Sequence, residues 1–154
     1  MGFIGGINLL IDNYLQEITK PKILYHSSDV QGLKILDPEE NVSSHLKFLK
    51  KYVYATDDKS YAAGFCFKWS SNDGIRFGQH KDNGPWILEI PKKHLNMLKT
   101  KCSIYTVDSN GFKKVYGLPT PEFYSKEKVS VLSEEKYNSA KECLEKNNVV
   151  IKVI

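Results

Sequence analysis

The sequence predicts an α+β fold in which most strands pair antiparallel. Segments rich in β-branched and aromatic residues follow one another through the second half of the chain. They are grouped together and do not alternate regularly with helices, which argues against a doubly wound parallel sheet. No Gly-x-Gly-x-x-Gly turn follows a strand, as a parallel dinucleotide-binding fold would need. A chain of 154 residues suits one domain, so we expect a single domain over residues 1–154.

The first third of the chain predicts a helix, a strand and then a strand–helix unit. Apolar residues recur at three–four spacing before Pro21, which predicts an amphipathic helix at about residues 7–19. Strands are expected at residues 22–26 and 52–56, with an irregular segment at 29–44. Asp57 or Asp58 can then cap a helix that carries one apolar face, made of Ala62, Phe65, Cys66 and Trp69.

The remainder of the chain predicts a long loop, further strands and a late helix. Glycines and polar residues between 70 and 85 indicate the loop, and two prolines indicate a rigid loop at 119–124. Ser133, followed by Glu134 and Glu135, predicts the start of a helix that runs to about Lys146. The expected strands are residues 86–90, 103–107, 112–116, 128–132 and 149–154.

Composition excludes several classes of function. The net charge is a mild +4 and Arg76 is the only arginine, which disfavours a dedicated nucleic-acid binder. Cys66, Cys102 and Cys143 are far apart and form no Cys-x-x-Cys pair, so we expect reduced, buried thiols and no bound metal. The four histidines are scattered as well. No Gly-x-Ser-x-Gly turn or cysteine signature of a hydrolase is present.

The N-terminal sequence lacks the basic start and apolar run of a signal peptide. No stretch approaches the roughly 20 apolar residues of a membrane span. These observations predict a cytoplasmic protein without a membrane partner.

Four separated residues carry the strongest indication of function. His26 lies in Ile-Leu-Tyr-His-Ser-Ser, and Tyr54 ends a predicted strand. Phe65 follows Tyr54 by eleven positions on the next helix, and Glu127 precedes a predicted strand. In this order and spacing they resemble the His-Tyr-Glu branch of the ADP-ribosyltransferases, the poly-ADP-ribose polymerase and diphtheria-toxin-like enzymes.

The resemblance implies a split antiparallel β-sandwich with peripheral helices, and NAD as the substrate. By position, His26 would orient ribose, while Tyr54 and Phe65 would hold nicotinamide beside the backbone of Ser27. Glu127 would be the catalytic carboxylate, since aromatic faces favour the pyridinium cation and a placed carboxylate stabilises charge in the transition state. The implied reaction is transfer of ADP-ribose to a protein or nucleic-acid acceptor, or NAD hydrolysis.

Departures from the family pattern leave alternatives open. Ser27 stands where the family usually has Gly, and Phe65 replaces the second tyrosine. Glu122 competes with Glu127 for the catalytic role. The same fold without catalysis would be a ligand- or protein-binding module, and an unrelated α+β interaction domain is a third possibility. The arginine-specific toxin branch would need Arg at position 26, and the RNA 2′-phosphotransferases need several arginines.

Overall fold

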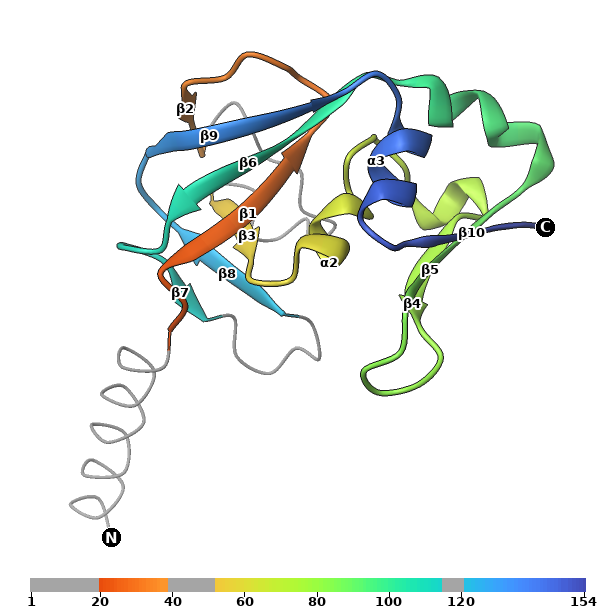
Figure 1. Cartoon of the computed structure of the whole chain (residues 1–154), viewed down its shortest axis with the longest axis horizontal. Coiled ribbons are helices and arrows are strands. Elements are labelled where there is room, and N and C mark those ends of the chain that lie inside the picture. The colour runs from red at the N-terminus through yellow and green to blue at the C-terminus, as the bar shows by residue number, and fades with distance from the viewer. Residues whose placement is uncertain (1–19, 39–51, 115–120) are drawn as a thin grey trace, which may run out of the picture.

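A computed structural model describes residues 20–38, 52–114 and 121–154 of the chain (Figure 1). The predicted helix at 7–19 lies outside these residues. The strands are β1 (Ile23–Ser28), β2 (Ile35–Leu36), β3 (Val53–Thr56), β4 (Arg76–Gln79), β5 (Trp86–Ile90), β6 (Cys102–Asp108), β7 (Lys113–Lys114), β8 (Glu122–Ser125), β9 (Val129–Tyr137) and β10 (Val150–Val153). The helices are α2 (Lys59–Ala63), α3 (Ala140–Lys146) and two 3-10 segments, η2 (Ser71–Asp73) and η3 (Lys92–Lys99).

The strands form two sheets. A seven-stranded sheet has the order β2-β9-β6-β1-β3-β8-β7, and a three-stranded sheet has the order β10-β5-β4. Every pair in the large sheet is antiparallel, and β10 with β5 is the parallel pair of the small sheet. Figure 1 shows the small sheet, η3 and α3 on one side of the large sheet, with α2 between them. The predicted α+β class with mostly antiparallel pairing is confirmed.

Each face of the large sheet buries its own apolar cluster. Ile104 of β6 belongs to a cluster that also takes side chains from the small sheet and both α-helices. The next residue, Tyr105, belongs to a second cluster with Leu24 and Phe112. Strand alternation explains this division, because successive side chains of a strand point to opposite faces.

The strand–helix unit of β3 and α2 forms as the sequence predicts. Asp58 adopts an extended conformation and its carboxylate accepts from the backbone N–H of Tyr61, which makes it the N-cap of α2. The helix ends at Gly64, where a Cβ atom would lie 2.3 Å from the ring of Phe77. The missing side chain at position 64 therefore lets the end of α2 touch strand β4.

The expected long loop at 70–85 is wrong in part. Residues 71–73 form η2, and β4 pairs antiparallel with β5 from Arg76 to Gln79. Local sequence gave little strand signal because β4 contains Gly78 and is mostly polar. Pairing with β5 and packing of Phe77 on Trp86, with ring centroids 5.1 Å apart, stabilise the strand instead. The segment predicted as a rigid loop, 119–124, similarly includes the first three residues of β8.

The predicted helix start at Ser133 is also wrong, because β9 continues to Tyr137. Glu134 accepts hydrogen bonds from Ser103 Oγ and from a backbone N–H of the neighbouring loop. Glu135 pairs with Lys59 of α2. These tertiary partners outweigh the local capping signal, and α3 begins instead after Ser139, whose side chain accepts from Glu142 N.

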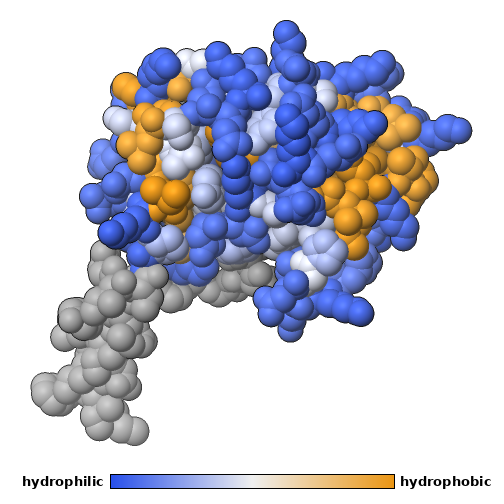
Figure 2. Space-filling view, in the orientation of Figure 1, coloured by the Kyte–Doolittle hydropathy of each residue, from blue (hydrophilic) through white to orange (hydrophobic). Residues whose placement is uncertain are grey.

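Most of the surface in view is polar, and a hydrophobic area lies at the end of the molecule that carries β10 (Figure 2). Val150, Val153 and Ile154 each have about half of their surface exposed there. Within the described part of the chain, no helix has both the length and the apolar character required to cross a membrane.

Candidate functional site

Three neighbouring strands carry the central residues of the candidate site. Strands β1, β3 and β8 are adjacent in the large sheet. Tyr25 pairs with Thr56, and Thr56 pairs with Glu122, so these three residues form one row across the sheet. His26 follows Tyr25 directly. The register therefore places Glu122 at the same end of the sheet as His26, while the His26 side chain, in register with Tyr105, lies on the opposite face from that of Glu122.

His26 is held by β3. Its Nδ1 atom lies 2.6 Å from the carbonyl oxygen of Tyr54. A carbonyl can only accept, so Nδ1 carries the proton and donates. Burial lowers the pKa of His26, and the Tyr54 carbonyl opposes this only in part. The imidazole is therefore neutral, and Nε2 is left as a hydrogen-bond acceptor.

The Nε2 atom of His26 is fully buried and has no hydrogen-bond partner among the residues that the structure describes. Buried polar atoms usually have a partner, so an orphaned acceptor is a feature that calls for an explanation. A ligand hydroxyl is a group that could donate to it.

Glu122 is the carboxylate that the sheet brings to this end. It is buried, and its Oε1 accepts a hydrogen bond of 2.9 Å from the hydroxyl of Tyr61 on α2. Burial and then the negative charge of Glu122 raise the pKa of the Tyr54 phenol, which keeps Tyr54 protonated. Tyr54, Tyr61 and Glu122 thus form one polar group between β3, β8 and α2.

Glu127, the predicted catalytic residue, lies elsewhere. It is exposed in the turn between β8 and β9, where its backbone N–H donates to Ser125 Oγ. Glu122 is the first residue of β8 and Glu127 comes two positions after the last, so the two carboxylates lie at opposite ends of that strand. Moreover, β6 and β1 separate β9 from β3. The geometry favours Glu122, the alternative left open by the sequence, over Glu127.

Ser27 is buried and Phe65 partly buried next to α2. Ser27 Oγ donates to the carbonyl oxygen of Ala62 at 2.6 Å, which fastens β1 to the helix. The ring of Phe65 packs edge-on against Tyr61 at 5.0 Å and stacks on Trp69 at 5.8 Å between centroids. Phe77 and Trp86 extend this group of rings into the small sheet.

Tyr61 is a residue that the sequence analysis missed. It lies four positions before Phe65, so both residues share one side of the α2 segment, and it contacts Glu122, Phe65 and Trp86. The helical i, i+4 spacing to Phe65 was the available signal.

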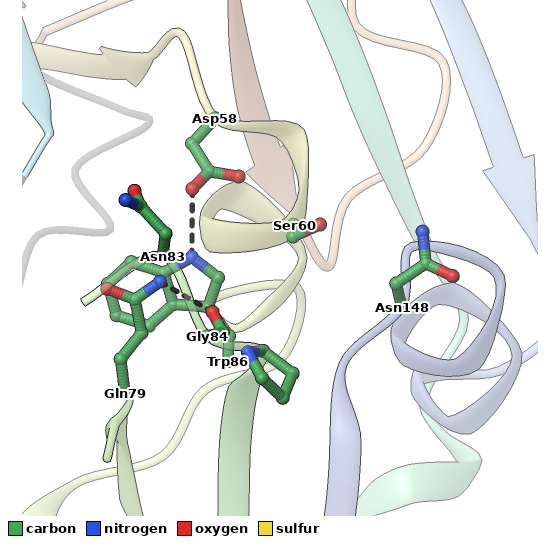
Figure 3. Close-up of a pocket in the computed structure, with 8 residues that line it drawn as sticks. Asp58, Ser60, Gln79, Asn83, Gly84, Trp86 and Asn148 are labelled. Carbon is green, nitrogen blue, oxygen red and sulfur yellow. Dashed lines mark hydrogen bonds between the residues drawn. The ribbon is translucent and has the colours of Figure 1, made fainter. Parts of the chain in front are cut away.

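An open pocket of about 350 Å³ lies beside the start of α2 (Figure 3). Trp86 Nε1 donates to Asp58 Oδ2 at 2.8 Å across it, and Gln79 Nε2 donates to Gly84 O. None of the predicted site residues is among those that line it: Asp58, Ser60, Gln79, Asn83, Gly84, Pro85, Trp86 and Asn148. Trp86 lines this pocket, and its ring packs 4.9 Å from that of Tyr61, whose hydroxyl donates to Glu122.

Tyr54, Tyr61 and Glu122 offer phenol groups and a buried carboxylate on the face of the sheet that carries α2, and His26 adds a neutral imidazole acceptor fixed to the Tyr54 carbonyl. Such a set can bind hydroxyl groups and stabilise a developing positive charge. Comparisons of the chain with protein-family models, with curated proteins and with solved structures give no match.

Proposed function

We propose that the protein has an ADP-ribosyltransferase-like fold and uses NAD to transfer ADP-ribose to a macromolecular acceptor, or hydrolyses NAD. The observation that carries this proposal is the ordered set of His26, Tyr54 and Glu122 on the adjacent strands β1, β3 and β8. The resemblance in sequence calls for a His on a first core strand, a Tyr at the end of a second and a Glu at the start of a later one. Glu122 opens β8, so it fills the last position better than Glu127.

In this proposal, His26 Nε2 accepts a hydrogen bond from a ribose hydroxyl of NAD. Its neutral state and the fixed proton on Nδ1 suit that role. Tyr54 and Phe65 contribute aromatic faces for the nicotinamide. The Glu122 carboxylate stabilises the positive charge that develops on the ribose as the bond to nicotinamide breaks, and the Tyr61 hydroxyl holds that carboxylate in place.

A second candidate is a binding module with the same fold and no turnover. One observation favours it: the side chains of His26, Tyr54 and Glu122 are only 3%, 6% and 5% exposed. The hydroxyl of Ser27 is also committed to Ala62, and Phe65 to its neighbouring rings. A site closed in this way would have to open before a substrate could enter.

Nicotinamide release from NAD separates the two candidates. We expect purified wild type to release nicotinamide, with or without cell lysate as the acceptor source. Glu122→Gln keeps the shape and removes the charge, so release should fall on the order of 10²-fold or more. Glu127→Gln is the matched control and should stay close to wild type.

If Glu127→Gln is the inactive variant, the assignment of the carboxylate is wrong and the reaction class stands. If wild type releases no nicotinamide under any of these conditions, the binding module is the better account. If the site binds NAD, NAD should raise the melting temperature of wild type and of Glu122→Gln, but not of Tyr54→Ala, because a ligand specific to the folded state stabilises it. No shift for wild type at millimolar NAD would contradict the NAD-dependent candidate and favour the binding module or a different fold.

A further inference from the structure

All three cysteines of the chain meet at one point in the core. Cys66 follows α2, Cys102 opens β6 and Cys143 lies in α3. Their Sγ atoms all lie within 4.8 Å of one another, and each residue is fully buried in the cluster between the large sheet and the helices. No disulfide joins them. Cysteine packs as a small apolar residue in many cores, but that role does not require every cysteine of a chain to adjoin the other two.

The spacing of the sulfurs fits a single metal ion. Zn²⁺ binds thiolates at about 2.3 Å, which sets sulfurs of a tetrahedral site about 3.8 Å apart. The three sulfurs form a triangle whose sides are no longer than 4.8 Å. To bind one ion, each sulfur would have to move toward the centre by at most about 0.6 Å. Small rotations of the side chains supply a movement of that size.

The surroundings favour a divalent ion over a monovalent one. Three thiols that lose their protons to one Zn²⁺ leave a complex with a single negative charge, whereas Cu⁺ would leave two. Because the cluster is apolar and buried, the smaller charge costs less to desolvate. Asn147 Nδ2 lies 3.9 Å from Cys143 Sγ and can donate to a thiolate there. Carbonyl oxygens of Ser139 and Ala140 lie 3.8 and 4.0 Å from the sulfurs of Cys102 and Cys66, so oxygen is at hand for a fourth ligand.

We propose that Cys66, Cys102 and Cys143 form a binding site for one Zn²⁺ ion, which ties the segment after α2 to β6 and α3. None of the three cysteines lines the pocket of Figure 3, and the proposed site is independent of the proposed reaction with NAD. It also explains why three elements far apart in sequence each contribute one sulfur to the same place. Sequence spacing gave no sign of it, since the ligands are brought together only by the fold.

Cobalt titration of the whole chain tests the proposal. Protein kept reduced and stripped of metal with a chelator is titrated with Co²⁺, which serves as a coloured stand-in for Zn²⁺. We expect a thiolate-to-cobalt charge-transfer band that saturates at one ion per chain and disappears when Zn²⁺ is added. Zn²⁺ should also raise the melting temperature. In Cys102→Ala and Cys143→Ala the apparent affinity should fall by more than about 100-fold, since each loses a direct ligand.

Ile104→Val is the matched control, because it alters the same core beside Cys102 and keeps all three sulfurs. It should bind Co²⁺ like wild type. If the cysteine variants do not fold, alkylation of wild type decides: in partly denaturing urea, where the buried thiols become reactive, all three should react more slowly with Zn²⁺ present than with a chelator. A wild type that shows no charge-transfer band, or a band that survives in Cys102→Ala, would overturn the proposal. The proposal would also be overturned if the reduced protein binds no Co²⁺ and then forms a disulfide in air, with loss of two hydrogens.

Discussion

Protonation of His26 should make the stability of the fold depend on pH between 7 and 5. The imidazole is buried, its Nδ1 donates to Tyr54 O, and burial lowers its pKa below the ordinary value of 6.5. In the unfolded chain the side chain is in water and binds a proton near pH 6.5. Above that pH both states are neutral at this residue, so its contribution to stability is fully present.

As the pH falls below 6.5, the unfolded state takes up a proton that the folded state does not. The free energy of unfolding therefore decreases, with a limiting slope of about 1.4 kcal/mol per pH unit. The decrease ends when the pH passes below the lowered pKa of the folded state. Hydrogen bonds from Lys59 and Lys146 lower the pKa values of Glu135 and Glu142 below 4.5, so these carboxylates contribute at more acidic pH.

Urea unfolding at half-unit steps from pH 7.5 to 5 measures this slope. His26→Asn is the suitable variant, because its amide can still donate to Tyr54 O and does not titrate. We expect the wild-type curve to fall more steeply than the variant curve below pH 6.5. The other histidines are common to both proteins and cancel in the comparison. Parallel curves would refute the reasoning, since they would show that His26 binds its proton equally well in the folded and unfolded states.

Two further predictions concern stability. Gly64→Ala should cost about 1–3 kcal/mol, because its new Cβ would overlap the Phe77 ring, and the cost should shrink in the Phe77→Leu background when both are measured by urea unfolding. Equal costs in the two backgrounds would argue against the contact. Ser139→Ala should cost about 1 kcal/mol by removing the N-cap of α3, whereas Ser133→Ala, in β9, should lose no cap. A larger loss at position 133 than at position 139 would support the helix start that the sequence predicted.

Local signals predicted those elements whose residues and caps agree with the fold. The β3–α2 unit was found because Val53 to Thr56 is a strand-forming run and Asp58 is a good N-cap. Strands β1, β5 and β6 were found through their β-branched and aromatic residues. Strand β4 has little local preference for an extended conformation, so its pairing with β5 determines that it is a strand. Local sequence does not identify that partner.

The residues of the candidate site were predicted in part, where they lie on strands with a clear local signal. His26 and Tyr54 lie on strands that the sequence identified, and the hydrogen bond between them links those strands. Glu122 and Glu127 could not be separated locally, because the strand that Glu122 opens lies in a segment with two prolines. The register of β8 against β3 distinguishes them, and register depends on pairing across the sheet. Convergence of the three cysteines likewise depends on contacts between distant elements.

The contact between Gly64 and the Phe77 ring has a consequence for the divergence of this sequence. No side chain at position 64 fits while a large ring occupies position 77, and a smaller residue at 77 would open a cavity against Gly64. The two positions should therefore change together, with Gly and an aromatic residue retained as a pair or both replaced. Homologous chains too distant to be aligned confidently over their full length could be recognised by this pair, thirteen positions apart, between the Tyr54 strand and the strand that begins at Trp86.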